Sequence, residues 1–560
     1  MALDKSDQRR LILDTVLLGV TGAVLVWLFN AAVHWSTELL LSGIAGYRPP
    51  GLPTEGDTSA ETVGPYGLWL IPLVTALGGL IVGFITNWLS PEAQGHGTDA
   101  VARSFHREGG SMRLRVAPVK LLASALTIGS GGSAGREGPI AQAMAAVGAW
   151  YADLTGRNED YRRLYLLLGA AAGISAIFRS PIGAALFAVE VLYADMEFEA
   201  GALVYATLAA IVAYALSGLV TGFGPLFLVN EQDLILGSPL DYAWYAVLGV
   251  SAGLVAAVLP LVFYRVRDGF QRLRAHPVLK PAIGGLLTGL VALALPQILG
   301  GGYGWIQSAI DGQLTLGLVL ALAAAKIGSM SFSIASGGSG GVFAPSLFVG
   351  AMLGGACAAV ADLTAAPFVV VGMAAVFAGA AHVPFAAMMM VVEMTGGYTL
   401  LVPSALGVLV SYLVQRHIAS SIRCRSIYEA QVGSRGESPA HHTEHLKIAL
   451  RILREQRLTR LEKLGNLDLL SLLRSGVAVD IGEGRKLLVG ILRADSPFVG
   501  STIAQSGRGL AGDDTNIIAV LRQEHMLGPQ PDLVLEAGDR LVLVCGVAGT
   551  EVLGRHLDSW

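Results

Sequence analysis

Two glycine-rich loops carry the pattern with the clearest chemical meaning. Residues 131–135 lead to Pro139 and residues 337–341 lead to Pro345, and both copies fit GGSxGxxxP. Each loop opens an apolar segment, and proline suits the first turn of a helix. A helix start exposes unpaired N–H groups and carries about half a positive charge. Two such starts facing one point would therefore bind an anion. The alternative is a structural role, in which the glycines only allow close helix packing.

Glu137 lies inside the first of these loops, two residues before the proline. A carboxylate beside an anion site would compete with the anion as a tethered charge, and protonation would remove the competitor. The residue would then act as a proton-linked gate; the alternative is a carboxylate that only caps the helix. Arg136 is nearby but no lysine is, so partial charges would hold the anion weakly enough to release it.

The composition indicates the surroundings of these loops. Of the 560 residues, 53% are hydrophobic and 14% are charged, and the mean hydropathy is +0.59. A soluble protein carries roughly 25% charged residues, so the sequence predicts a protein that crosses a lipid bilayer several times. A net charge of −4 gives no sign of nucleic-acid binding.

The apolar segments fall into two length classes. Stretches long enough to span a bilayer lie near 11–33, 66–89, 201–222, 240–264, 281–300 and 314–332. Shorter pieces, interrupted by Gly and Pro, lie near 117–128, 139–152, 164–177, 181–194, 345–360, 367–380 and 384–394. Short apolar pieces within a membrane domain are typical of broken or re-entrant helices around a binding site.

A second motif also occurs twice. Both copies fit P-x-x-A-x4-V-E, from Pro181 to Glu190 and from Pro384 to Glu393. The copies are 203 residues apart (384 less 181), and the glycine-rich loops are 206 apart (337 less 131). Two motifs at nearly one offset predict a duplicated membrane domain with its site at the repeat interface. The symmetric glutamates favour a structural role, such as accepting hydrogen bonds from backbone N–H groups.

The composition changes after about residue 420. We expect a membrane domain at 1–430, with repeats at about 66–222 and 280–417, then a polar linker at 431–445. Residues 446–560 read as a small α/β domain, with a charged helical stretch followed by short β-rich runs and Gly or Pro turns.

Charge predicts the orientation. Basic residues flank both ends of the apolar region, whereas the loop between Tyr47 and Pro65 is acidic. The positive-inside rule then places both termini in the cytoplasm and this loop outside a cell membrane, inner or plasma. The three cysteines, Cys357, Cys424 and Cys545, are far apart and form no disulfide or zinc pattern, and no cofactor or metal is expected.

These motifs resemble those of the CLC family of chloride channels and chloride–proton antiporters. Gly135–Pro139 (GREGP) matches the gating-glutamate motif of the family, and Gly341–Pro345 (GVFAP) matches its second anion-binding loop. Gly95–Gly97 falls at the first selectivity loop, and Ser426–Tyr428 falls at the inner-gate tyrosine. The resemblance covers about residues 1–430.

The resemblance implies an all-α polytopic membrane domain of inverted repeats with re-entrant and broken helices. It also implies a homodimer that moves chloride or a similar small anion through one pathway per subunit, with Glu137 as the external gate. The amides of Val342 and Phe343 and the hydroxyl of Tyr428 would line the site. The implied anion-binding residues are His96, Gly97, Arg136, Gly138, Gly341, Val342, Phe343, Ala344 and Tyr428.

Two departures from the family pattern limit what it implies. His96 stands where the first loop usually offers a serine, which opens the choice among chloride, nitrate and fluoride. The ring either adds a donor or a charge, or turns away and leaves only backbone. Val191 stands at the proton-relay position, where proton-coupled members carry a second glutamate. The acidic residues at 195, 197 and 199 either substitute for it or form a solvated loop, so conduction and H⁺/Cl⁻ exchange both stay open.

The C-terminal segment resembles the TrkA-type C-terminal regulatory domain. The matching stretches lie at 495–501, 516–522 and 535–541. The resemblance implies a cytoplasmic module that pairs in dimers and either binds a small-molecule regulator or serves dimerisation alone. The residues singled out for this role are Ser496, Pro497, Val499, Gly500, Gly538 and Asp539.

Parts of the sequence also fit two other classes of protein. Gly131-x-Ser133-x-Gly135 fits the nucleophile pattern of serine hydrolases, with His382 as the nearest candidate base, but a single catalytic site does not need a second copy. A cation transporter would suit the C-terminal module, but the chain lacks a filter such as TVGYG and a cluster of intramembrane carboxylates. The sequence therefore does not predict an enzyme.

Overall fold

The computed structural model separates into two compact units, Met1–Gln431 and Val432–Trp560. Most of the linker expected at 431–445, and the helical stretch expected after it, lie outside the described residues. The described residues of the first unit are 5–65, 67–230, 241–419 and 426–431. Those of the second are 432–433, 438, 440, 479–482, 485–505, 516–522, 525–527, 530–546 and 556–558.

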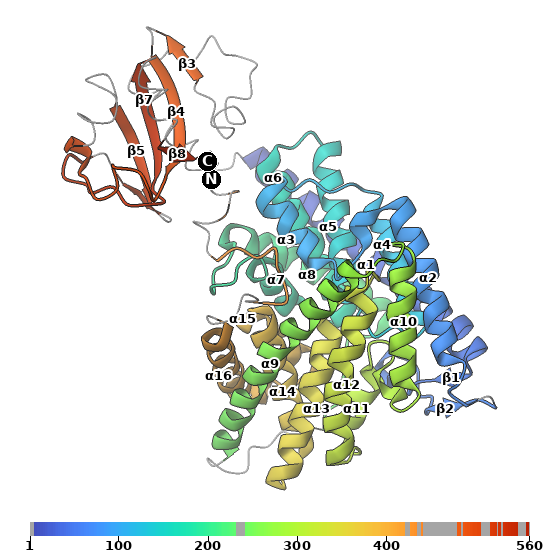
Figure 1. Ribbon diagram of the computed structural model, residues 1–560. Coiled ribbons are helices and arrows are strands. Elements are labelled where there is room, and N and C mark those ends of the chain that lie inside the picture. Colours follow the sequence, from blue (N-terminus) through green and yellow to red (C-terminus); the bar gives the residue numbers. More distant parts are fainter. Residues whose placement is uncertain are drawn as a thin grey trace. The chain divides into compact units, whose positions relative to one another are not determined.

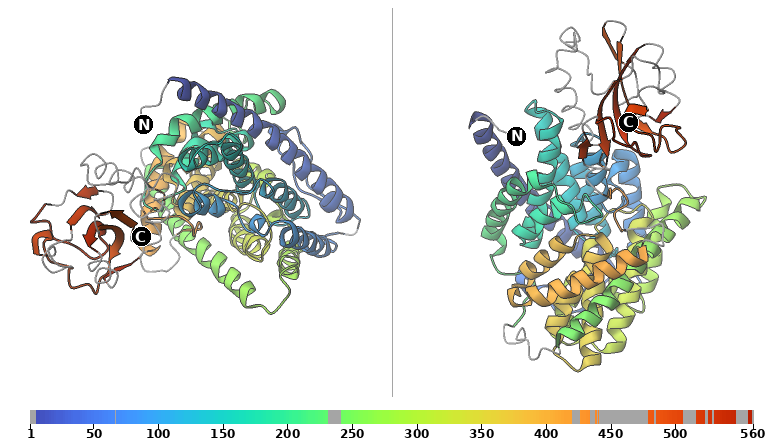
Figure 2. Two further views of the ribbon diagram at one scale, coloured as in Figure 1. Left: turned by 90° about the horizontal axis from the view of Figure 1, so that it is seen from above. Right: turned by 90° about the vertical axis from the view of Figure 1, so that its left-hand side faces the viewer.

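The first unit is helical, as the sequence predicts (Figure 1). Its α-helices are α1 (Lys5–Thr37), α2 (Ile71–Leu89), α3 (Thr98–Arg107), α4 (Val116–Gly129), α5 (Glu137–Leu154), α6 (Glu159–Phe178), α7 (Pro181–Glu190), α8 (Ala200–Thr221), α9 (Asp241–Arg272), α10 (Leu279–Ala292), α11 (Tyr303–Ile310), α12 (Leu316–Ala335), α13 (Phe343–Ala361), α14 (Ala365–Ala381), α15 (Pro384–Thr395) and α16 (Leu401–Ala419). A π-helical segment η1 (Glu38–Ile44) continues α1, and a short hairpin pairs β1 (Tyr47–Arg48) with β2 (Thr62–Val63). Figure 2 shows these helices crossing one another at varied tilts.

Seven helical segments in the described part of the chain are long and apolar enough to cross a membrane. Shorter apolar helices, such as α4, α7 and α15, lie among them, which confirms the expected mixture of full spans and short pieces. The stretch 281–300 was expected to span, but α10 ends at Ala292. Pro296, which disfavours helix in the residue before it, opens a 3₁₀ turn there. Conversely, the piece expected at 345–360 belongs to α13, which has 19 residues and is long enough to span.

The two repeats have the same order of helices. Helices α2 to α8 correspond in sequence to α10 to α16, and the glycine-rich loops meet between them. The Gly135 N–H donates to the Gly341 carbonyl at 2.8 Å, and the Gly341 N–H donates to the Gly135 carbonyl at 2.7 Å. This antiparallel bridge joins equivalent residues, as two units related by a two-fold rotation would do. The geometry agrees with the inverted repeats that the sequence predicts.

Two buried lysines hold the loops that precede α3 and α11. Lys120 on α4 donates to the carbonyls of Ala93 and Gly95, at 3.0 and 2.7 Å. Lys326 on α12, at the same offset of 206 residues (326 less 120), donates to Ile298 and Gly300 at 2.8 Å each. A buried ammonium is stable only when its donors are satisfied, so each lysine fixes its loop to the helix. The sequence analysis did not find these residues.

Each of the two symmetric glutamates caps the helix that carries the other one. Glu190, at the end of α7, accepts from the N–H groups of Phe385 and Ala386 in α15, at 3.1 and 2.7 Å. Glu393, in the last turn of α15, accepts from Gly183 N–H at 2.8 Å in the first turn of α7. A carboxylate stabilises a helix start by pairing its free N–H groups. The structural role expected for both residues is confirmed.

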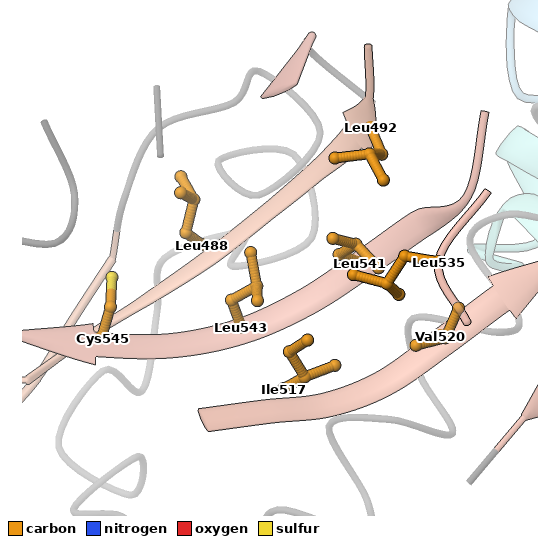
Figure 3. Close-up of a cluster of buried hydrophobic side chains, with 8 residues drawn as sticks. All are labelled: Leu488, Leu492, Ile517, Val520, Leu535, Leu541, Leu543 and Cys545. Carbon is orange, nitrogen blue, oxygen red and sulfur yellow. The ribbon is translucent and has the colours of Figure 1, made fainter. Parts of the chain in front are cut away.

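The second unit contains an antiparallel sheet. Its strands are β3 (Val479–Gly482), β4 (Arg485–Leu492), β5 (Asn516–Arg522), β6 (His525–Leu527), β7 (Arg540–Gly546) and β8 (Leu557–Asp558). The order is β3-β4-β7-β5-β6, and β8 pairs with β4. Leucine, isoleucine and valine side chains of β4, β5 and β7 meet with Leu535 and Cys545 in one apolar cluster (Figure 3).

The residues singled out in this domain make contacts within it. Gly500 and Gly538 have φ angles of +85° and +87°, which glycine adopts readily, and form tight turns. Asp539 is buried and accepts from the Arg522 guanidinium at 2.8 Å; this hydrogen bond raises the pKa of Arg522. Ser496 accepts from the Phe498 N–H at 3.4 Å within the turn that also holds Pro497 and Val499. These contacts support the fold of the domain, and a regulator site there stays a prediction.

Candidate functional site

Three cavities follow one another along the loops that join the repeats. A small enclosed cavity is lined by Thr98, Glu137, Gly138, Ile174, Phe178, Phe187, Val342, Phe343, Met390 and Tyr428. A cavity of ≈ 580 Å³, here the His96 cavity, is lined by His96 and Gly97, the two residues before Thr98. A cavity of ≈ 740 Å³, here the Arg136 cavity, is lined by Arg136, the residue before Glu137. Residues next to each other in the chain therefore line the small cavity and each of the two larger ones.

Three helices begin at the small cavity. Thr98, Glu137 and Phe343 are the first residues of α3, α5 and α13, and all three line it. The sequence analysis expected two helix starts and found the third only as a loop. Each start brings unpaired N–H groups and a partial positive charge to the cavity, which favours an anion there.

Glu137 places its carboxylate at the start of α13. Its side chain is 3% exposed, and Oε2 lies 3.4 Å from the Ala344 N–H, which points to it. A β-carbon added to Gly341 would lie 2.8 Å from the same oxygen, so the glycine leaves room for the carboxylate. The Glu137 carboxyl group thus lies where the two loops meet, at the start of α13.

Tyr428 reaches the small cavity from a segment that three helices hold. The N–H of Ile427 donates to the Ala380 carbonyl of α14 at 2.8 Å. The Tyr264 hydroxyl of α9 donates to the Ile427 carbonyl at 2.8 Å, and Asp99 of α3 accepts from the Ala430 N–H at 2.7 Å. The tyrosine is therefore fixed at the site although it is far from the loops in sequence.

The His96 ring packs against two aromatic rings beside the small cavity, although His96 does not line that cavity. Its ring centroid lies 5.4 Å from that of Tyr428 and 6.0 Å from that of Phe263, and the residue is 7% exposed. Nδ1 is buried and has no hydrogen-bond partner among the described residues. Thr98, two residues later, does line the small cavity.

Arg136 has its charge compensated outside the small cavity. Its guanidinium pairs with Glu55 at 2.7 Å, donates to Asn30 at 3.1 Å and lies 4.8 Å from the ring centroid of Tyr303. Glu55 belongs to the acidic loop that the sequence places outside. The structure thus brings together five of the predicted site residues around the small cavity: Glu137, Gly138, Val342, Phe343 and Tyr428.

The other predicted residues surround that cavity without lining it. They are His96, Gly97, Arg136, Gly341 and Ala344. Sequence reasoning missed the apolar lining of Ile174, Phe178, Phe187 and Met390, which comes from α6, α7 and α15. Such residues carry no local signal, since they look like any core position of an apolar helix.

Val191 is buried, and its carbonyl accepts from the Gln431 amide at 3.0 Å. Asp195 pairs with Arg416 at 3.0 Å, and its side chain is 42% exposed. Glu199 accepts from the Tyr193 hydroxyl at 2.9 Å. The acidic residues that follow Val191 therefore have partners of their own, and a relay role for them stays a prediction.

The geometry does not favour a hydrolase. The two ring nitrogens of His382 contact the Ala194 carbonyl at 3.0 Å and the Gln415 side chain at 2.6 Å. These partners occupy both nitrogens, so His382 has none left to activate Ser133 as a general base.

The contact of Gly138 with the first loop gives a testable prediction. A β-carbon at Gly138 would lie 1.8 Å from the His96 carbonyl oxygen, so Gly138→Ala must displace backbone. We expect a loss of about 1–3 kcal/mol in unfolding free energy, measured by denaturation in detergent. Gly355→Ala in α13 is the control: an added β-carbon would lie 3.8 Å from Val319 of α12 and from Val369 of α14, so this change should not destabilise the protein. Equal stability of both variants would contradict the close contact.

Comparison with known proteins identifies the family. The family described as "Voltage gated chloride channel" matches residues 78–416, and the "TrkA-C domain" matches residues 491–557. The H(+)/Cl(-) exchange transporter ClcA of Salmonella agona (strain SL483) is 29% identical over 449 residues, which cover 76% of this chain and 90% of that protein. The same transporter of Citrobacter koseri is 29% identical over 417 residues, covering 71% and 84%.

Solved structures show the same fold. A CLC-type fluoride/proton antiporter has a TM-score of 0.64 at 24% identity, covering 77% of this chain and 100% of that chain. A slow cyanobacterial Cl⁻/H⁺ antiporter has a TM-score of 0.62 at 20% identity, covering 76% and 97%. Since the first family match spans more than half of the sequence, this chain belongs to the voltage gated chloride channel family and carries a TrkA-C domain near its C-terminal end.

Proposed function

We propose that this protein transports chloride or a similar small anion across a membrane, through one pathway per subunit that Glu137 gates. The observation that supports this most is that Glu137, whose carboxylate faces the start of α13, lines the small cavity, while the residues next to Glu137 and Thr98 in the chain line the two larger cavities. An anion that crosses must replace this carboxylate. Protonation of Glu137 removes the negative charge that competes with the anion for the helix starts, and this opens the pathway.

The lining of the small cavity suits passage rather than tight binding. Among the described residues that line it, none is lysine or arginine. Helix starts and the Thr98 and Tyr428 hydroxyls offer partial charges, which hold an anion weakly enough to let it leave. The anion-binding set that we propose is the one expected from the sequence, with Thr98 added and with Arg136 acting at the mouth.

The setting of this function follows from the sequence. We propose a cell membrane protein, inner or plasma, with both termini in the cytoplasm, and a homodimer in the bilayer. On this orientation the Arg136 cavity opens outside and the His96 cavity opens inside. We propose the TrkA-C domain as a cytoplasmic module that takes a small-molecule regulator. The related proteins are transporters, which agrees with a role other than catalysis.

The proposal includes two modes of transport, channel-like conduction and H⁺/Cl⁻ exchange. Val191 replaces the relay glutamate, whereas the curated relatives named above are exchangers.

A transport assay with the purified protein in liposomes distinguishes the two modes. Anion efflux is recorded at a fixed voltage together with external pH, with chloride, nitrate and fluoride in separate runs. We expect anion efflux that rises as pH falls. Chloride-driven proton movement against its gradient would establish exchange, and its absence would establish conduction; no flux of any anion would refute the proposed function.

A further inference from the structure

Tyr303 contacts Glu137 through the carboxylate oxygen that does not face α13. It is the first residue of α11, and its hydroxyl donates to Glu137 Oε1. The other carboxylate oxygen, Oε2, is the one that faces the Ala344 N–H at 3.4 Å. The carboxylate is therefore held between a phenol and a helix start, with one oxygen assigned to each.

The ring of Tyr303 is itself fixed. The Arg136 guanidinium lies 4.8 Å from its centroid, and the Phe227 ring lies 6.1 Å away. Arg136 is in turn held by Glu55 at 2.7 Å. A continuous chain of contacts thus runs from the acidic loop through Arg136 and Tyr303 to the gate.

The repeat explains why a tyrosine can reach this place. Tyr303 follows Gly302, which has a φ of +78°, just as Thr98 follows Gly97, with a φ of +90°. The two positions are 205 residues apart (303 less 98), and each is the first residue of its helix. Thr98 faces the small cavity, whereas Tyr303 lines the Arg136 cavity and reaches Glu137 with a longer side chain.

We propose that Tyr303 is a positioning residue that holds the ionised Glu137 carboxylate in the closed position. This inference rests on the proposed function. A phenol donates a stronger hydrogen bond to a carboxylate than to a neutral carboxyl group. The bond therefore favours the charged form of Glu137, which blocks the pathway, and a lower pH is needed to protonate Glu137 and open it.

Other charged and titratable groups face this pair. Arg136 and Lys326 act on Glu137 as positive charges, and Tyr428 faces it across the small cavity. Glu55 acts on Tyr303 from the acidic loop. All four remain in place when only the Tyr303 hydroxyl is removed, so a Tyr→Phe change isolates the hydrogen bond.

The test is anion efflux from liposomes as a function of external pH with Tyr303→Phe in the full chain. Removing the hydroxyl destabilises the ionised carboxylate more than the neutral carboxyl group, so Glu137 protonates at higher pH. The midpoint of activation should move upward by about one pH unit, the size of a hydrogen bond to a charged group. Flux at pH values above the wild-type midpoint should rise about tenfold with it.

Two variants serve as controls. Tyr214→Phe removes a hydroxyl that donates to the Phe223 carbonyl at 3.1 Å, and it should leave the midpoint unchanged. The double variant Tyr303→Phe with Glu137→Gln should match Glu137→Gln alone, because the two changes act through one contact. Additive effects in the double variant would refute the proposal.

Each outcome bears on a distinct claim. No flux in the wild-type protein would refute the proposed function itself. A pH-gated wild-type protein with an unshifted Tyr303→Phe midpoint would refute the role of Tyr303 alone. If the Tyr303→Phe variant does not fold, replacement of Tyr303 by 3-fluorotyrosine tests the same hydrogen bond, because its phenol is a stronger donor of nearly the same shape. That replacement should lower the midpoint, and a midpoint that stays or rises would also refute the role.

Discussion

Glu137→Gln is expected to give anion flux that is high and independent of pH. The glutamine keeps the size of the side chain but carries no charge, so it does not compete for the helix starts at the small cavity. In the wild-type protein the protonated fraction of the gate falls about tenfold for each pH unit above its midpoint, and flux should fall with it. The difference between the two proteins therefore grows with pH and is largest in alkaline buffer.

The measurement is anion efflux from liposomes across a series of external pH values. Glu61→Gln is the matched control, because Glu61 is an exposed carboxylate of the acidic loop that bonds to Tyr47 at 3.0 Å. Its pH profile should equal that of the wild-type protein. If exchange is observed in the wild type, Glu137→Gln should also lose proton coupling. A Glu137→Gln profile that still follows pH would remove the residue from the gate.

Glu393→Ala is expected to cause the largest loss of stability. The carboxylate is 7% exposed and accepts from the Ser180 hydroxyl at 2.6 Å, Gly183 N–H at 2.8 Å and Ile182 N–H at 3.2 Å. Removing it leaves three donors at the start of α7 without a partner in an apolar interior. Each unsatisfied buried group costs about 1–3 kcal/mol, so the total should reach about 3 kcal/mol or more.

The measurement is the unfolding midpoint and the folded yield in detergent. Glu190→Ala frees two donors on α15, so its loss should be smaller than that of Glu393→Ala but still clear. Glu108→Ala removes an exposed carboxylate after α3 and serves as the control. Glu393→Gln, which retains one acceptor oxygen, should fall between the control and Glu393→Ala. A Glu393→Ala protein as stable as the control would show that other groups satisfy the start of α7.

Much of the site could be read from the sequence because its parts are local. The glycine-rich loops, the prolines after them and Glu137 lie within a few residues of one another, and duplication repeated the loop signal. Helix starts follow from local residue types, so α5 and α13 were expected at Pro139 and Pro345, two residues after the positions at which they begin. The sequence predicted that Glu190 and Glu393 accept hydrogen bonds from backbone N–H groups, but it did not predict which helices donate them.

Other parts had no local signal. Lys120 and Lys326 lie on apolar helices, and their partners are carbonyl oxygens of loops about 25 residues away. Tyr303 was not singled out from the sequence. The role that we propose for Tyr303 depends on its contact with Glu137, which is 166 residues away in the chain.

The sequence by itself determined the kind of protein: few charges, duplicated loops and motifs that resemble the CLC family indicate a membrane protein that transports an anion, and a carboxylate beside a helix start predicts a titratable gate. Only the tertiary structure decided that three helix starts meet, that His96 stays against Tyr428 and that Glu137 is held by Tyr303. The physical reason is the range of each effect. Helix starts and hydrophobic periods are set by neighbouring residues, whereas the hydrogen bonds that position a gate join residues that only the folded repeats bring together.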